Sequence, residues 1–332
     1  MRSVPSASFQ CLSSPEGLWS AWLQCRRGKR RQPAIAQFDL NADRAVFALS
    51  RQLCSGRYQP QAPRVKLVYD PKPRLVAAPT IADRIVQTAL LNAIAPTYEQ
   101  GFIDQSYACC SGRGPHRAVL AYLQLSRRYD FRLQLDIRRY FASINHAVLY
   151  GLFAHRLHDR QTLGLIETLL HSGGAVYAHE ETRRLLGLGE DFPRSGVGMP
   201  LGAHLSHWSG GLYLDGLDHF IKRDLKFRGY LRYMDDFTLF HDDPARLEAA
   251  REAVSEWLLT ERRLRLKDPV APVQSTRQAS SYLGFRVSRA GLAPGPKAKR
   301  RLRQRLRQAE AMGGVRLTKG LQAYRGLLLS IG

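Results

Sequence analysis

The segment RYMDDFTLF at 232–240 most narrows the folds open to this chain, because it sets two carboxylates among residues typical of a buried β-strand. Asp235 and Asp236 are adjacent, and the positions around them are aromatic or apolar. A turn between two antiparallel strands is one explanation, since Asp is common in turns. That explanation accounts for this segment alone.

A third carboxylate has the same setting, because Asp136 in LQLDIRRYF also ends an apolar, alternating strand pattern. Carboxylates brought together in a core raise one another's pKa, which is costly unless a cation is present. Mg²⁺ takes carboxylate oxygens and keeps positions open for water and phosphates. Two such ions about 4 Å apart can activate a 3′-hydroxyl and stabilise a leaving pyrophosphate oxygen. The three carboxylates therefore indicate two-metal nucleotidyl transfer.

The charge of the chain indicates which partner such a site serves. There are 50 Lys and Arg against 28 Asp and Glu, a formal net charge of +22, with clusters RRGKRR at 26–31 and KAKRRLRQRLR at 297–307. Such a surface favours a polyanion, either nucleic acid or an anionic membrane. The second cluster lacks the apolar face that membrane binding needs, and neither a membrane span nor a secretory signal is expected. We expect a cytoplasmic protein bound to nucleic acid.

Hydrophobic periodicity and turn residues predict alternating helices and strands. Helices are expected over 15–56, 81–98, 115–129, 146–170, 205–225 and 245–264. Strands are expected at 58–80, 131–141, 229–242 and 281–294, and 172–195 is expected to be irregular and to contain a hairpin. Because regular βαβ spacing is missing, the fold class is α+β rather than a doubly wound sheet.

Five motifs, taken in order, resemble those of reverse transcriptases. They are KPRLVAAPTIADRIVQTAL at 72–90, LDIRRYF at 135–141, GVGMPLGAHLS at 196–206, YMDD at 233–236 and SYLGFRV at 281–287. The resemblance covers roughly residues 60–300. It implies a right-hand polymerase with fingers, a ferredoxin-like palm and a short helical thumb.

The resemblance also implies a division of the chain. The N-terminal region and fingers would occupy 1–130, the palm 131–290 with a fingers insertion at about 146–200, and a short basic thumb 291–332.

Roles for the site residues follow from the same resemblance. Asp136, Asp235 and Asp236 would be the catalytic, metal-binding triad, and the backbone carbonyl of Ile137 would complete one metal site. The expected cofactor is a pair of Mg²⁺ ions, with Mn²⁺ as a possible substitute.

Substrate contacts are also implied. Lys72 and Arg74 match residues that hold the incoming triphosphate, and Arg suits this because its planar fork binds phosphate oxygens bidentately. Phe141 matches an aromatic gate against the ribose 2′-hydroxyl, the alternative being a simple core aromatic. The resemblance also implies that Leu201 lies at the dNTP pocket. The expected nucleic-acid contacts are Arg84, Lys267, Lys297, Arg300 and Arg301.

Leu201 points to a branch of the family, because many reverse transcriptases have Gln there and an aliphatic residue loosens checking of the nascent base pair. Together with SYACCSGRGPHRAV at 106–119 it resembles the diversity-generating retroelement branch, which copies RNA with errors at adenines. His207 departs from that branch, which has Gln. A phage-defence or other bacterial reverse transcriptase is the alternative.

Two hypotheses of different class remain. The first is an active RNA-directed DNA polymerase that uses an RNA template, a primer and dNTPs, with a small oligomeric helical accessory protein or a structured RNA as partner. The second is a nucleic-acid-binding scaffold subunit with little templated synthesis. The three carboxylates favour the first, since a scaffold has no reason to hold them against their mutual repulsion.

Overall fold

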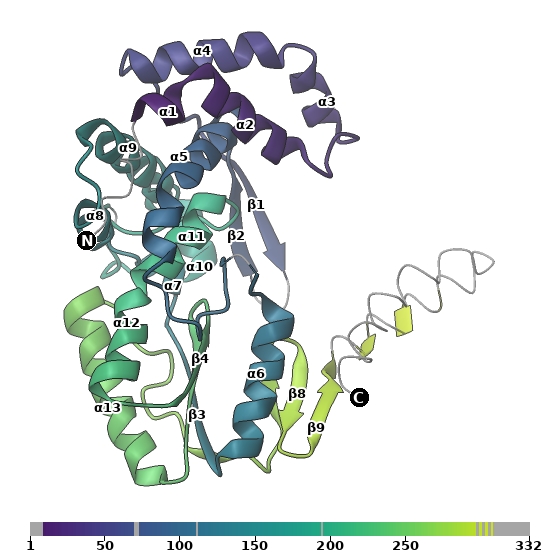
Figure 1. Ribbon diagram of the computed structural model, residues 1–332, viewed down its shortest axis with the longest axis vertical. Helices are drawn as coiled ribbons and strands as arrows, with labels where there is room; N and C mark the ends of the chain where they lie inside the picture. The colour runs from purple at the N-terminus through teal and green to yellow at the C-terminus, as the bar shows by residue number, and fades with distance from the viewer. Residues whose placement is uncertain are drawn as a thin grey trace. The chain divides into compact units, whose positions relative to one another are not determined.

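The computed structural model describes residues 9–69, 73–110, 112–193 and 195–296, with positions 299–300, 303–304 and 307 of the C-terminal segment (Figure 1). Two compact units are built from interleaved parts of the chain. Unit 1 comprises Met1–Phe102, Arg138–Gly216 and Leu258–Leu264, and unit 2 comprises Ile103–Ile137, Leu217–Trp257 and Arg265–Gly332.

Unit 1 is mainly helical. Its helices are α1 (Phe9–Ser13), α2 (Pro15–Arg26), α3 (Pro33–Asp39), α4 (Ala42–Cys54), α5 (Ile81–Glu99), α7 (Tyr140–Ser143), α8 (His146–Ala154), α9 (Arg160–Ala178), α10 (Glu180–Leu186) and α11 (His204–Tyr213). Side-chain caps fix several helix starts, because Ser14, Thr80, Asn145 and Asp159 each accept a hydrogen bond from a backbone N–H of the first turn. The hairpin of β1 (Arg64–Tyr69) and β2 (Pro73–Ala78) completes this unit.

Unit 2 is built on a four-stranded antiparallel sheet. Its strands are β3 (Phe131–Asp136), β4 (Gly229–Tyr233), β5 (Asp236–His241) and β6 (Gln274–Ser275), in the order β4-β5-β3-β6. Helices separate β3 from β4 and β5 from β6, so the sheet has the βαββαβ connectivity of a ferredoxin-like fold. Helices α12 (Asp215–His219) and α13 (Pro244–Arg262) lie in these connections, and a π-helix, η1 (Phe220–Asp224), follows α12.

One face of this sheet is covered by α6 (Pro115–Arg128), and a second, three-stranded sheet packs beside it (Figure 1). The smaller sheet contains β7 (Ser280–Tyr282), β8 (Phe285–Ser288) and β9 (Gly291–Pro294). Tyr122 of α6 stacks on Tyr282 with ring centroids 4.4 Å apart and meets Phe240 edge-on at 5.1 Å. This aromatic cluster joins α6 to both sheets.

The α+β class, the strand pair at β1–β2 and the two strands around the YMDD turn are confirmed. The hairpin expected within 172–195 is wrong, because α9 continues to Ala178 and α10 follows. Gly174 does not break the helix but permits close packing, since a Cβ there would lie 2.5 Å from the His146 ring. The single helix expected over 205–225 is instead α11, α12 and η1. Within the described ranges, no helix is long and apolar enough to cross a membrane.

Candidate active site

The acidic residues of unit 2 converge at one end of the four-stranded sheet. The β3–β5 register pairs Asp136 directly with Asp236. The β4–β5 register pairs Tyr233 with Asp236, which leaves Met234 and Asp235 as the turn between the strands. Met234 has φ of +58°, a left-handed conformation that costs a residue other than glycine about 1–2 kcal/mol. The fold thus collects the three predicted carboxylates, although Asp136 is about 100 residues away along the chain.

The electrostatics of this cluster oppose full ionisation. Burial, with a smaller contribution from the charges of Asp136 and Asp235, raises the pKa of Asp236 to about 7, and a hydrogen bond from Gln134 offsets part of that rise. Gln134 Nε2 donates to Asp236 Oδ1 at 3.3 Å, and Ser280 Oγ donates to Gln134 Oε1 at 2.9 Å. Sequence reasoning missed Gln134 and Ser280. The period-two alternation of β3 could have found Gln134, since it puts that side chain on the same face as Asp136.

Lys267 neutralises part of the negative charge of the three carboxylates. Its Nζ donates to Asp136 Oδ2 in an ion pair, and its backbone N–H donates to the Asp136 carbonyl at 2.8 Å. The hydrogen bond to Asp136 raises the pKa of Lys267. Ile137, the next residue, forms an isolated antiparallel bridge with Leu266. Lys267 was predicted as a nucleic-acid contact, and the structure places it against the first carboxylate.

The donor set fits a hard divalent cation. Carboxylate oxygens are the ligands that Mg²⁺ prefers, and the Lys267 ammonium shows that the Asp136 carboxylate attracts a positive charge. In the described part of the chain, no three His, Cys, Asp or Glu side chains are arranged to hold one metal ion among them. Such a complete protein cage is not required, because Mg²⁺ usually binds through one or two carboxylates together with water and substrate phosphates.

An open cleft of about 460 Å³ adjoins the carboxylates within unit 2. Its polar lining comes from Gln134, Asp136, Asp236, Lys267, Asp268, Gln274, Ser280 and Ser281. The cleft therefore brings carboxylates, a cation and neutral hydrogen-bonding groups to one space that is open to solvent.

The predicted dNTP contacts belong to unit 1, where backbone hydrogen bonds connect three of their segments. Met199 N–H donates to the Phe141 carbonyl at 2.8 Å, and Ala77 N–H donates to the Leu201 carbonyl at 2.7 Å. Leu201 also bridges Val76 of β2, the strand that carries Arg74. The loop 196–202 is thereby tied both to β2 and to α7. Lys72 lies outside the described residues.

Two aromatic neighbours at the start of α7 have different surroundings. Tyr140 is buried, and its hydroxyl donates to the Gly210 carbonyl at 2.5 Å, whereas Phe141 is only partly buried. The Phe141 ring lies 5.5 Å from that of His207, whose Nδ1 is 2.9 Å from the Ala203 carbonyl. The residue that departs from the retroelement pattern is thus a neighbour of the predicted sugar gate.

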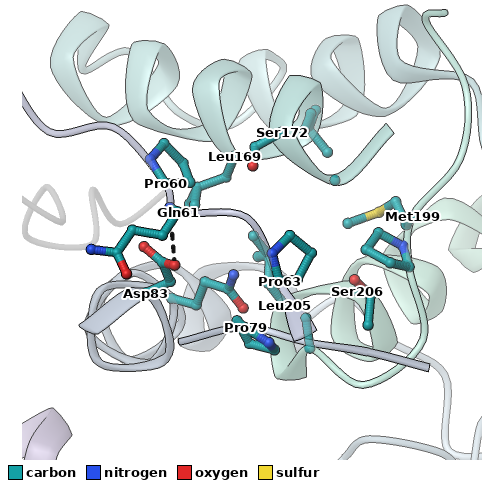
Figure 2. Close-up of a pocket in the computed structure, with 16 residues that line it drawn as sticks. Pro60, Gln61, Pro63, Pro79, Asp83, Leu169, Ser172, Met199, Leu205 and Ser206 are labelled. Atoms are coloured by element: carbon teal, nitrogen blue, oxygen red, sulfur yellow. Dashed lines mark hydrogen bonds between the residues drawn. The ribbon is translucent and has the colours of Figure 1, made fainter. Parts of the chain in front are cut away.

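A small cavity of about 40 Å³ in unit 1 lies between α5, α9 and the segment that begins at Met199 (Figure 2). Asp83 lines it and serves the fold, because its carboxylate accepts hydrogen bonds from Tyr58 at 2.7 Å, Thr80 at 2.7 Å and the Gln61 N–H at 3.2 Å. Arg84, the predicted nucleic-acid contact beside it, is partly exposed.

The basic C-terminal segment contributes to a second cleft of unit 2. Arg300 is exposed there and lines a cleft of about 390 Å³ together with Arg286, Lys299 and Arg303. Lys297 and Arg301 lie outside the described residues. Sequence reasoning missed Arg286, which β8 presents to the same cleft. Four cations around one cleft suit an anionic ligand.

Comparison with known proteins gives a consistent family. The family model described as reverse transcriptase (RNA-dependent DNA polymerase) matches residues 69–287, well over half of the chain. Protein YkfC of Escherichia coli (strain K12) is 26% identical over 276 residues, which cover 73% of this chain and 70% of YkfC. Group II intron-encoded protein LtrA of Lactococcus lactis subsp. cremoris is 25% identical over 183 residues, 54% of this chain but only 28% of LtrA.

Among solved structures, a telomerase from Candida albicans in complex with a fragment of telomeric RNA matches with a TM-score of 0.49 and 12% identity. The match covers 72% of this chain and 46% of the telomerase chain, so this chain spans less than half of that protein.

Proposed function

Because the chain belongs to the reverse transcriptase (RNA-dependent DNA polymerase) family, we propose that it is an active polymerase that copies an RNA template into cDNA by metal-dependent nucleotidyl transfer. The observation that carries this proposal is the β3–β5 register, which sets Asp136 opposite Asp236 with Asp235 in the adjoining turn. A nucleic-acid-binding scaffold needs no such cluster, in which burial and, to a smaller extent, the neighbouring carboxylates raise the pKa of Asp236.

Asp136, Asp235 and Asp236, with the carbonyl of Ile137, would hold two Mg²⁺ ions, and Mn²⁺ is expected to substitute for them. When bound, the metals supply Lewis-acid activation of the primer hydroxyl and stabilise the leaving oxygen. Gln134 orients the Asp236 carboxylate by a hydrogen bond at 3.3 Å. Lys267 neutralises the Asp136 carboxylate, and with a metal bound there it would be available to the nucleic acid or to the substrate phosphates.

The substrate contacts that we propose are those of the family resemblance. Lys72 and Arg74 would hold the triphosphate, Phe141 would exclude a 2′-hydroxyl, and Leu201 would lie against the nascent base pair. The nucleic-acid contacts would be Arg84, Lys267, Lys297, Arg300 and Arg301. The partners in this proposal are the RNA template, the primer with its cDNA, the dNTPs and an accessory helical protein or structured RNA, in the cytoplasm.

For the biological role we propose error-prone cDNA synthesis in a diversity-generating retroelement, supported by the aliphatic Leu201 in the GVGMPLG motif. A second candidate is favoured by His207, which replaces the Gln of that branch and lies 5.5 Å from the Phe141 ring. On that candidate the protein is a phage-defence or other bacterial reverse transcriptase with more faithful synthesis.

The test is primer extension on an RNA template with Mg²⁺ and four dNTPs. Asp235→Ala should lower the rate by about 10³-fold or more, because it removes a metal ligand. Asp130→Ala is the matched control, since Asp130 precedes β3 at the far end of the same strand and pairs with Arg289 at 2.8 Å. Its rate should stay within about threefold of wild type.

Sequencing of the products separates the two candidate roles, because errors opposite template adenines favour the retroelement and faithful copies favour the alternative. Activity retained in Asp235→Ala would refute the proposed site. A wild-type protein that extends no primer would shift the function to the scaffold.

A further inference from the structure

We propose that Arg232, anchored by Asp218, is a positioning residue that fixes the Met234–Asp235 turn and thereby sets the place of the Asp235 carboxylate. The inference rests on the proposed function, in which Asp235 holds a catalytic metal. Neither residue belongs to the predicted metal or substrate contacts.

The ion pair between these residues is deeply buried and bidentate. Arg232 Nε donates to Asp218 Oδ1 at 2.7 Å, and Nη2 donates to Asp218 Oδ2 at 2.6 Å. Arg232 is 2% exposed and Asp218 is fully buried. Tyr230, on the same face of β4, donates from its hydroxyl to Asp218 Oδ1 at 2.6 Å. Because Asp218 belongs to α12, this network clamps β4 against that helix.

The third nitrogen of the guanidinium reaches the turn itself. Arg232 Nη1 donates to the Met234 carbonyl at 3.0 Å, and that carbonyl belongs to the peptide bond that leads into Asp235. Met234 has φ of +58°, so the turn is in a conformation that the residue does not favour alone. A charged donor on this carbonyl offsets part of that cost and restricts the orientation of the next residue.

The backbone of Arg232 is held on its other side as well. Its N–H donates to the Gln105 carbonyl at 2.9 Å, and its carbonyl accepts from the Tyr107 N–H at 2.9 Å. Residues 105–107 thus continue the sheet beyond β4 just before the turn. Arg232 is therefore held by both its main chain and its side chain. Because it also contacts the Met234 carbonyl, it holds the turn in place.

Only an arginine can make these contacts together. Its planar fork presents two parallel donors to a carboxylate while a further nitrogen points elsewhere, whereas a lysine ammonium is a single compact point of charge. Arg232→Lys should keep the positive charge near Asp218 but lose the contact to Met234. If Arg232 only filled the core, Arg232→Lys would affect the site no more than the same change at another buried arginine.

Arg132 supplies that comparison. It is 1% exposed and lies on β3 of the same sheet, separated from β4 by β5, where Nη1 donates to the Gln278 carbonyl at 2.9 Å and Nη2 to Gln274 Oε1 at 3.2 Å. Arg132 lies four residues before Asp136 along β3 and pairs with Phe240 of β5. It is therefore remote from the turn. Arg132→Lys therefore removes the contacts of a buried guanidinium in the same sheet without touching the turn.

The experiment compares Arg232→Lys, Arg132→Lys and wild type by three measurements. Thermal unfolding gives the folded fraction, the free-Mn²⁺ signal in electron paramagnetic resonance gives Mn²⁺ affinity, and single-turnover primer extension gives the rate. Arg232→Lys should lose about 10- to 100-fold in Mn²⁺ affinity or rate per folded molecule, as expected for a residue that orients a metal ligand. Arg132→Lys should stay within about threefold on both.

Equal effects of the two variants on Mn²⁺ affinity and rate would overturn the inference. If Arg232→Lys does not fold, Tyr230→Phe replaces it, since it removes one hydrogen bond to Asp218 and leaves the ion pair. A threefold or larger loss of rate would then support the inference, and an unchanged rate would overturn it. A wild type that binds Mn²⁺ without extending primers counts against the proposed function alone, and the Mn²⁺ affinities of the variants then decide the inference.

Discussion

The turn that carries Asp235 and the loop that carries Leu201 are positioned by different kinds of interaction. In unit 2, charged side chains hold the turn, because Arg232 joins Asp218 to the Met234 carbonyl in a buried network. In unit 1, the loop 196–202 is held mainly through main-chain carbonyls, which accept from the Ala77 N–H, the Tyr177 hydroxyl and the His146 ring.

The two kinds of interaction constrain the turn and the loop in different ways. A buried charge network in a sheet keeps the turn that carries Asp235 in one place and makes its geometry sensitive to electrostatics. A loop held by backbone contacts keeps its path whatever side chain it presents, so the residue at position 201 is free to vary. We therefore expect changes at the turn to act on rate and on response to pH, and changes in the loop to act on stability and selectivity.

The largest expected effect in the comparison is a pH dependence of stability in the metal-free protein. The pKa of Asp236 is raised to about 7, so the folded protein keeps a proton that the unfolded chain releases near pH 4. This contribution is fully present below pH 4 and is lost as the pH rises from 4 to 7. When the pH is lowered from 8 to 5, the Tm of the wild type should rise by roughly 5 °C more than the Tm of Asp236→Asn.

The Asp236→Asn reference is needed because other groups act in the opposite direction. Burial lowers the pKa of His146, which therefore destabilises the fold on acidification. Added Mg²⁺ should raise Tm more at pH 8 than at pH 6, since ionised Asp236 attracts the cation. A Mg²⁺ effect independent of pH would show that Asp236 is not part of the metal site.

The next effect concerns the loop and its close approach to β2. Gly202 has φ of +114°, and an added Cβ would lie 2.9 Å from the Ala77 carbonyl oxygen. Gly202→Ala should cost about 1–3 kcal/mol in the free energy of unfolding, measured by denaturant titration. Gly151→Ala in α8 is the control, because nothing lies within 4 Å of its added Cβ, and it should stabilise by up to about 1 kcal/mol. Equal effects of the two changes would mean that the loop is not held against β2.

The smallest expected effect is on selectivity. Leu201→Gln restores the hydrogen-bonding side chain that many reverse transcriptases have at this position, while the loop is held at the carbonyl of the same residue, by Ala77. The misincorporation frequency should fall by about 3- to 10-fold, the ratio for one hydrogen bond, with the extension rate changed little. Sequencing of cDNA from both proteins measures this, and an unchanged error spectrum would remove position 201 from the determinants of fidelity.

Much of the architecture could be predicted because it depends on local patterns. The helical period of 81–98 became α5, Thr80 caps that helix, and the alternation around Asp136 became β3. The prediction failed at 172–195, where α9 continues to Ala178 and Gly174 packs closely against His146. Local sequence does not contain the neighbour that makes a small residue necessary.

The sequence by itself determined that three carboxylates lie in strand-like settings on a strongly basic chain, and the ordered motifs determined the family. Only the tertiary structure decided that Asp136 lies opposite Asp236, that Lys267 forms an ion pair with Asp136, and that Arg232 links Asp218 to the Met234 carbonyl. The physical reason is that residue type and spacing act along the chain, whereas strand register and buried ion pairs form between segments that are distant in sequence. Which side chains meet is fixed only when those segments pack.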